Sequence, residues 1–143
     1  MNIILFGFKG CGKTHYGRRL SKLLHRPFID TDHLIEARHP GLTVRQIHET
    51  LGEAAFRAEE AEVILGLVDT KHSIIAVGGG AVLIPRNVEM LQRLGKMIYL
   101  DVSLETVIKR GVSLSLGPLE PIYRARKPIY ESIPAYRISV DGL

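Results

Sequence analysis

Apolar segments that do not alternate with polar residues recur along the chain, and each has the length of a buried strand. The clearest is Asn2–Phe6, at the start of the sequence. Similar runs occupy Ser73–Val77 and Lys96–Leu100, and two further short strands are expected at Arg26–Asp30 and Arg137–Val140. The pattern therefore predicts five short strands distributed over the whole chain.

Helical segments separate these strands. Lys13–His25 spaces its apolar residues as an amphipathic helix does, and Gly52–Asp69 is a longer segment rich in Ala and Glu. Local signals mark where several helices begin or end. They are, in chain order, a capping-box spacing, a proline suited to a first turn, a glycine suited to the position after a last turn, and a serine that can cap a helix. These signals lie at Thr43 with Gln46, at Pro85, at Gly95 and at Ser103.

This order of elements predicts an α/β fold, a five-stranded parallel sheet flanked by helices on both faces. No repeat or domain boundary is visible, so residues 1–143 are expected to form a single domain. Pro128 predicts that any helix over Tyr123–Ile133 is broken or displaced near that residue. The segment Gly111–Leu119 is expected to be a loop. We also expect that a final helix, which would usually cover the strand at Arg137–Val140, is missing from the sequence.

Composition narrows the class of protein. The 143 residues are 45% hydrophobic and 24% charged, which suits a folded domain with its own core. No apolar run approaches the roughly 18 residues of a membrane span, and we expect no signal peptide, because the apolar first residues have no basic segment before them and no small-residue cleavage site. The single cysteine, Cys11, excludes an internal disulfide and a zinc site of the usual Cys/His kind. We therefore expect a cytoplasmic protein with no membrane partner.

The charge balance favours anionic partners. Nineteen Lys and Arg against fifteen Asp and Glu give a net charge of +4. No basic run is longer than the pair Arg18 and Arg19, aromatic residues make up 6%, and Trp is absent. A nucleic-acid surface is therefore not expected, and small anions such as nucleotides are the better candidates. A monomer is the default expectation.

The strongest motif is Gly7–Thr14, which matches the phosphate-loop pattern G-x-x-x-x-G-K-[ST] in full. It follows a predicted buried strand and opens a helix, so that backbone N–H groups and the helix N-terminus can face phosphate oxygens. Lys13 is placed to reach the β and γ phosphates, and the Thr14 hydroxyl to ligate Mg²⁺. Cys11 is interpreted as a small residue that fills the loop, with a redox role as the alternative.

Two carboxylates follow the second predicted strand. Asp30 and Asp32 lie where ligands bind in open α/β sheets, and an Asx turn with a helix cap is the alternative interpretation. Because the two residues alternate along an expected extended segment, their side chains should start on opposite sides. One could then face a metal ion while the other faces a substrate.

Three further groups lie later in the sequence. Arg57 and Glu60 share a helix face, which alone is most often a solvated surface. Gly78–Gly80 directly follow a buried strand, where they bring the backbone close to a ligand or form a plain turn. Arg126–Tyr130 contains two basic residues and a proline, and by itself would be a basic surface turn.

Taken together and in this order, the motifs resemble the shikimate kinase family. The most specific pieces are Gly10–Thr14, Asp30–Asp32, Gly52–Arg57, Gly78–Gly80 and Arg126–Tyr130, and the resemblance runs from Asn2 to Asp141. It implies a fold like that of the nucleoside monophosphate kinases. It also implies that the γ-phosphoryl group of ATP moves to the 3-hydroxyl of shikimate, with Mg²⁺ as cofactor.

The resemblance also implies a role for each matching residue. ATP would be held by Gly10, Cys11, Gly12, Lys13, Thr14 and His15, with Arg110 near the adenine. Thr14 and Asp30 would hold Mg²⁺, Asp30 through water. Shikimate would be bound by Asp32, Phe56, Arg57, Glu60, Gly79 and Arg126. Lys13 and Asp32 would be catalytic, Asp32 as the acceptor of the hydroxyl proton.

The sequence departs from the family in one segment. The family closes a lid that carries a catalytic arginine, but Gly111–Leu119 is short and has Gly117 where that arginine is expected. Either the natural lid is reduced or the chain omits segments, which we favour, and Arg124 is the next basic candidate. Two other functions stay open at this point. One is a related small-molecule kinase such as a gluconate kinase, and the other is a nucleotide-binding module without turnover.

Overall fold

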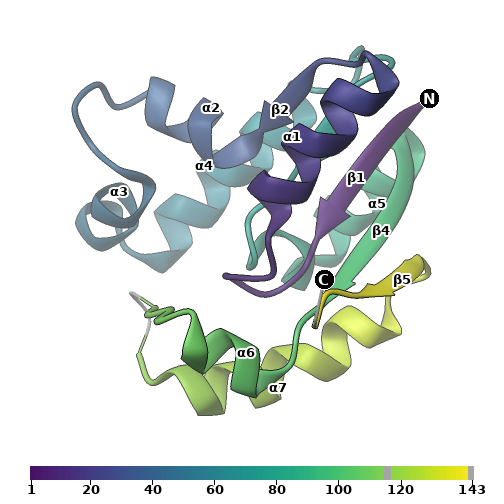
Figure 1. Ribbon diagram of the computed structural model, residues 1–143. Coiled ribbons are helices and arrows are strands. Elements are labelled where there is room, and N and C mark those ends of the chain that lie inside the picture. The colour runs from purple at the N-terminus through teal and green to yellow at the C-terminus, as the bar shows by residue number, and fades with distance from the viewer. Residues whose placement is uncertain (115–116, 142–143) are drawn as a thin grey trace.

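The computed structural model of the chain describes residues 1–114 and 117–141, and these form a five-stranded sheet (Figure 1). The strand order is β2-β3-β1-β4-β5, and each neighbouring pair is parallel. The strands are β1 (Asn2–Phe6), β2 (Phe28–Asp30), β3 (Ile74–Ala76), β4 (Gly95–Asp101) and β5 (Tyr136–Ser139). The predicted α/β fold with a five-stranded parallel sheet is therefore confirmed.

Helices lie on both faces of this sheet. Figure 1 shows α1 beside β1 on the side of the sheet nearer the viewer and α5 behind β1 and β4, with α2 and α3 beyond β2 and with α6 and α7 near the carboxyl ends of the strands. The helices are α1 (Lys13–Leu24), α2 (Thr31–Ala37), α3 (Val44–Leu51), α4 (Glu53–Leu65), α5 (Pro85–Leu94), α6 (Leu104–Lys109) and α7 (Leu119–Ser132), with a short 3₁₀ turn η1 (Ala81–Leu83).

The central position of β1 explains its unbroken apolar sequence. Ile4, Leu5 and Phe6 are at most 1% exposed, because helices cover both faces of the strand. Leu5 lies opposite Ala76 of β3 and opposite Ile98 of β4. The carboxyl ends of β1 and β3 therefore lie side by side, and the glycine-rich loops that follow them meet at the same edge of the sheet.

Most of the predicted helix boundaries are confirmed. Thr43 and Gln46 form a complete capping box at the start of α3, and Ser103 caps α6 by accepting from the backbone N–H of Thr106. Pro85 is the first residue of α5. The helix expected to run to Asp69 is shorter than predicted, since α4 ends at Leu65 and the chain then turns.

The predicted break at Pro128 is wrong, because α7 continues through this proline. A proline inside a helix removes one backbone hydrogen bond, here the bond to the carbonyl four residues earlier, at Arg124. Arg124 is exposed, so water can satisfy that carbonyl. The helix is also held by Tyr123 and Tyr130, which are 6% and 1% exposed in the core. Packing on either side of Pro128 therefore overrides the local preference.

The expected loop at Gly111–Leu119 is confirmed only for its described part. A turn follows α6, Leu114 and Gly117 form an isolated antiparallel bridge, and α7 begins at Leu119. The expectation for residues 115–116 lies outside the described residues. Across the described ranges, no helix has the length and apolar character that crossing a membrane requires.

The buried side chain of Asn2 joins three segments at the amino ends of the strands. Its Nδ2 donates to the carbonyls of Thr70 and Leu94, at 2.7 and 2.9 Å, and its Oδ1 accepts from the N–H of Ser73 at 2.9 Å. We expect Asn2→Ala to lower the free energy of unfolding by about 3 kcal/mol or more, because it leaves buried backbone groups without partners.

Denaturant unfolding measures this effect. Ser132→Ala is the control, since it removes an exposed hydroxyl that donates to Ile129, and it should stay within about 0.5 kcal/mol of the parent. Equal stabilities for the Asn2 and Ser132 variants would contradict the bridging role of Asn2.

Candidate functional site

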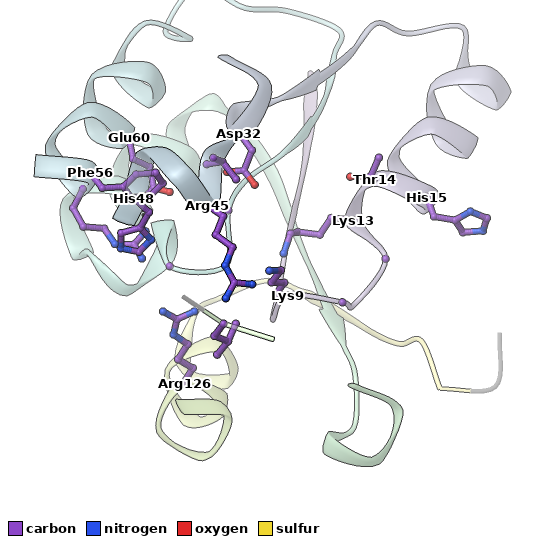
Figure 2. Close-up of a pocket in the computed structure, with 18 residues that line it drawn as sticks. Lys9, Lys13, Thr14, His15, Asp32, Arg45, His48, Phe56, Glu60 and Arg126 are labelled. Atoms are coloured by element: carbon purple, nitrogen blue, oxygen red, sulfur yellow. Dashed lines mark hydrogen bonds and ion pairs between the residues drawn. The ribbon is translucent and has the colours of Figure 1, made fainter. Parts of the chain in front are cut away.

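A cleft of about 470 Å³ lies at the carboxyl ends of β1 and β3, between the phosphate loop and helices α2, α3, α4 and α7 (Figure 2). Most of the predicted site residues line it. They are Gly10, Gly12, Lys13, Thr14, His15, Asp32, Phe56, Arg57, Glu60, Gly79 and Arg126. Three predicted residues, Cys11, Asp30 and Arg110, are not part of its lining.

The phosphate loop has the conformation that its glycines allow. Gly10 and Gly12 have φ angles of 89° and 95°, in the left-handed region that favours glycine. Lys13 begins α1, and its Nζ donates to the carbonyl of Gly7 at 2.8 Å, across the loop. Cys11 is fully buried in the main core, as expected of a residue that fills the loop. The thiol is therefore not part of the cleft surface.

Asp30 ends β2 and caps α2. Its Oδ1 accepts from the backbone N–H of Asp32 at 2.9 Å, and its Oδ2 lies 3.5 Å from the Thr14 hydroxyl. The expectation of an extended segment through Asp32 is wrong, because the capped helix α2 begins at Thr31. Asp32 consequently lies in the first helical turn and lines the cleft, while Asp30 faces Thr14 outside its lining.

Asp32 and Glu60 bring two carboxyl groups against the backbone of Gly78. A Cβ atom at Gly78 would lie 3.1 Å from an oxygen of each, so the absence of a side chain there makes room for both. Burial raises the pKa of Asp32, and the charge of Asp30 raises it further, while Lys13 opposes the shift. Burial also raises the pKa of Glu60, although the neighbouring Arg57 favours its ionised form.

Arg57 is held in place by two carboxylates on its own helix. It donates to Glu60 at 2.8 Å and to Glu53 at 2.7 Å, and its guanidinium lies 5.2 Å from the centre of the Phe56 ring. A Cβ atom at Gly80 would collide with this guanidinium. Arg57 and Glu60, which were expected to share a helix face, therefore form an ion pair in which Glu60 is buried and Arg57 half-buried, and the solvated-surface interpretation is wrong.

The lack of side chains at Gly78–Gly80 leaves space for other side chains of the site, in addition to any space it leaves for a ligand. Gly78 makes room for carboxylates and Gly80 for Arg57, while the Gly79 carbonyl accepts from the Tyr130 hydroxyl at 2.6 Å. Tyr130 comes from α7, four residues after Arg126, which is 8% exposed and lines the cleft. The interpretation of this motif as a basic surface turn is therefore wrong.

Two other arginines lie elsewhere. The Arg110 guanidinium donates to the carbonyl of Gly10, on the outside of the phosphate loop. Arg124 is exposed and pairs with Glu120 at 2.8 Å on α7, and it does not line the cleft. The structure therefore does not support Arg124 as a cleft arginine.

Sequence reasoning missed three polar residues of the cleft, Lys9, Arg45 and His48. Lys9 occupies a variable position of the phosphate-loop pattern, and no local rule assigns it a role. Arg45 and His48 lie on α3, and the His48 ring stacks on Phe56 with centres 4.4 Å apart. The capping box at Thr43 predicted that a helix begins here. Only the packing of α3 against α4 shows which face of α3 reaches the cleft.

The raised pKa of Asp32 predicts a pH-dependent effect on stability. Above its raised folded pKa, Asp32 is an ionised carboxylate in a partly buried site, which costs folding free energy. We expect Asp32→Asn to be more stable than the parent at pH 7. The difference should shrink as the pH falls through the folded pKa and vanish below the unfolded value of about 4.

Denaturant unfolding of both proteins between pH 4 and 7.5 checks this expectation. Asp101→Asn is the opposite control, because Lys127 and Arg137 hold the pKa of Asp101 below its ordinary value even though burial alone would raise it. That variant should be less stable than the parent at pH 7. A stability difference for Asp32→Asn that does not change with pH would contradict the prediction.

Comparison with known proteins agrees with this geometry. The family model described as shikimate kinase matches residues 9–141. A shikimate kinase from Symbiobacterium thermophilum is 42% identical, over 99% of this chain and 87% of its own length. The solved structure of a shikimate kinase from Acinetobacter baumannii in complex with shikimate superposes with a TM-score of 0.85. That structure is 35% identical and the alignment covers 96% of this chain and 82% of its own.

A gluconokinase from Sinorhizobium meliloti is a more distant match. Its TM-score is 0.61 and its identity 16%, over 99% of this chain and 83% of its own, so that it shares the fold alone. The phosphate loop, the Arg57–Glu60 ion pair and the cleft arginine from α7 thus occur in a chain that is similar to shikimate kinases over nearly its whole length. The chain belongs to the shikimate kinase family.

Proposed function

We propose that this protein transfers the γ-phosphoryl group of ATP to the 3-hydroxyl of shikimate, releasing ADP and 3-phosphoshikimate. One observation carries the proposal: a single cleft holds the phosphate-loop Lys13 on one side and two arginines on the other, the half-buried Arg57 and the buried Arg126. This arrangement fits a nucleoside triphosphate on one side of the cleft and a small carboxylated acceptor on the other, with the transferred phosphoryl group between them.

The ATP subsite would be the phosphate loop. Backbone N–H groups from Gly10 to Thr14 and the N-terminus of α1 would bind the phosphates, and Lys13 would leave the Gly7 carbonyl for the β and γ phosphates. His15 lies at the same edge of the cleft, while Arg110 would flank the nucleotide from the outside of the loop.

Thr14 and Asp30 would hold Mg²⁺, and their geometry fits this ion. A hydroxyl and a carboxylate oxygen 3.5 Å apart are hard oxygen donors, and this spacing suits an ion bound partly through water. Among the described residues no group of three or more His, Cys, Asp or Glu side chains could hold a metal by itself, so phosphate oxygens would complete the coordination. When bound, Mg²⁺ neutralises charge on the phosphates.

The acceptor subsite would lie between Arg57 and Arg126. A guanidinium matches the planar geometry of a carboxylate, and two of them would grip the shikimate carboxylate from two sides. Asp32 would accept hydrogen bonds from the ring hydroxyls. Phe56 and Gly79 would line the same subsite, and Glu60 would keep Arg57 in position.

The reaction requires positioning and charge neutralisation more than covalent catalysis. The bond between the γ-phosphorus and its bridging oxygen breaks, and a bond from the shikimate oxygen to phosphorus forms. Asp32 would take the hydroxyl proton, and burial helps because it raises the pKa of this carboxylate toward the working pH. Lys13 would stabilise the charge that develops on the transferred group. We further propose that the protein is a cytoplasmic monomer.

A direct assay tests this function against its alternatives. Purified protein should phosphorylate shikimate in the presence of ATP and Mg²⁺ and should leave gluconate unchanged, and Lys13→Ala should reduce kcat for shikimate at least about 10²-fold. Lys22→Ala, on the exposed end of α1, is the matched control and should keep parental turnover. Turnover of gluconate would favour the related kinase, and turnover of neither acid would favour a binding module.

The contact between Gly80 and Arg57 gives a second test. We expect Gly80→Ala to weaken shikimate binding about tenfold, because the new methyl group displaces the guanidinium and weakens charged hydrogen bonds worth roughly 1.5–3 kcal/mol. Gly80 has a φ of −92°, so alanine strains no backbone there.

Calorimetric titration of shikimate and of ATP separates the outcomes. Gly66→Ala, at the far end of α4, is the control and should bind both ligands as the parent does. If Gly80→Ala lowered ATP affinity as much as shikimate affinity, the position assigned to Arg57 would be incorrect.

A further inference from the structure

Two basic side chains that line the cleft come from different parts of the chain and donate to the same residue, Ser113. The Lys9 Nζ donates to the Ser113 carbonyl at 2.8 Å, and the Arg45 guanidinium donates to the Ser113 hydroxyl at 2.9 Å. Lys9 belongs to the phosphate loop and Arg45 to the first turn of α3. Neither residue has a place in the function proposed above, and both line the cleft.

These two charges are poorly neutralised by the protein. Among the described residues, the only carboxylate within ion-pair distance of Arg45 is Glu49, an exposed side chain on the same helix at 3.2 Å, and Lys9 has none. Burial lowers the pKa of Lys9, and repulsion from Arg45 and from Lys13 lowers it further, with Asp32 opposing. A group of like charges at the wall of a cleft is an arrangement that an anion stabilises.

The position of Lys9 and Arg45 in the cleft indicates which anion they would bind. Figure 2 shows the Lys9 and Arg45 side chains reaching the space between Lys13 and Arg126, which places them between the two proposed subsites. In a direct transfer the phosphoryl group crosses this space, and its charge is spread over three oxygens that point away from the line of transfer. Lys13 alone would face only one side of that group.

We propose that Lys9 and Arg45 are further catalytic residues that bind the oxygens of the phosphoryl group during transfer. The proposal rests on the function proposed above and extends it. Ser113 offers these cations only neutral acceptors, a carbonyl and a hydroxyl, so a phosphate oxygen can replace them and form a stronger, charge-assisted hydrogen bond.

Arg45→Ala tests the proposal by steady-state kinetics. We expect kcat to fall about 10²-fold, the range for loss of one group that stabilises transition-state charge, while KM for shikimate changes less than about threefold. Lys9→Ala should act in the same direction. Arg45→Gln keeps most of the length and removes the charge, and it serves as a second variant that should behave like Arg45→Ala.

Two comparison variants separate a catalytic role from a structural one. If Arg45 only anchored Ser113, Ser113→Ala would lose as much activity as Arg45→Ala, whereas the proposal expects it to lose far less. Arg38→Ala removes an arginine of similar exposure that pairs with Glu62 outside the cleft, and it should keep parental kcat.

A binding measurement gives a readout that does not depend on turnover. By calorimetry, Arg45→Ala should weaken binding of 3-phosphoshikimate at least about tenfold and binding of shikimate less than about twofold, because only the product carries the phosphoryl group. Unchanged product affinity, parental kcat in both Arg45 variants, or an equal loss in Ser113→Ala would each overturn the proposal. A parent protein that did not phosphorylate shikimate would instead contradict the proposed function itself.

Discussion

The pairing of β1 with β3 decides where the side chains of the cleft lie. Leu5 faces Ala76 across this pair, so both strands end at the same level and their glycine-rich loops lie next to each other. The loop after β1 carries the phosphate-binding backbone, and the loop after β3 makes room for Arg57, Asp32 and Glu60. Because parallel strands have their carboxyl ends on one side of the sheet, both subsites open toward the same cleft.

The cleft holds buried charged groups that suit ligand binding but lower the stability of the folded protein. Glu60 and Asp32 are carboxyl groups whose pKa values burial raises, and they lie near the half-buried Arg57 and the loop residue Lys13. Such groups are retained where function requires fixed charges in a site of low polarity. A cleft of this kind recognises an acid and a polyphosphate by the same physical means, with donors held in place before either ligand arrives.

Helix α7 is held in place by three contacts along its length. Tyr123 donates to the Val102 carbonyl at 2.7 Å, Tyr130 donates to the Gly79 carbonyl, and Lys127 pairs with Asp101 at 2.9 Å. These contacts hold the helix on both sides of Pro128 and set the position of Arg126. A sequence rule that considers only the backbone near a proline has no access to them, which is why the predicted break was wrong.

The sequence by itself determined the features that depend on residues close together in the chain. The phosphate loop, the capping box at Thr43, the cap at Ser103 and the apolar strands follow from local chemistry, and the order of the motifs identified the family. Only the tertiary structure decided which side chains meet across long separations, such as Arg45 and Lys9 at Ser113 or Tyr130 at Gly79. The physical reason is that such contacts depend on how helices pack onto the sheet, and the free energy of that packing is shared among many residues that no local pattern records.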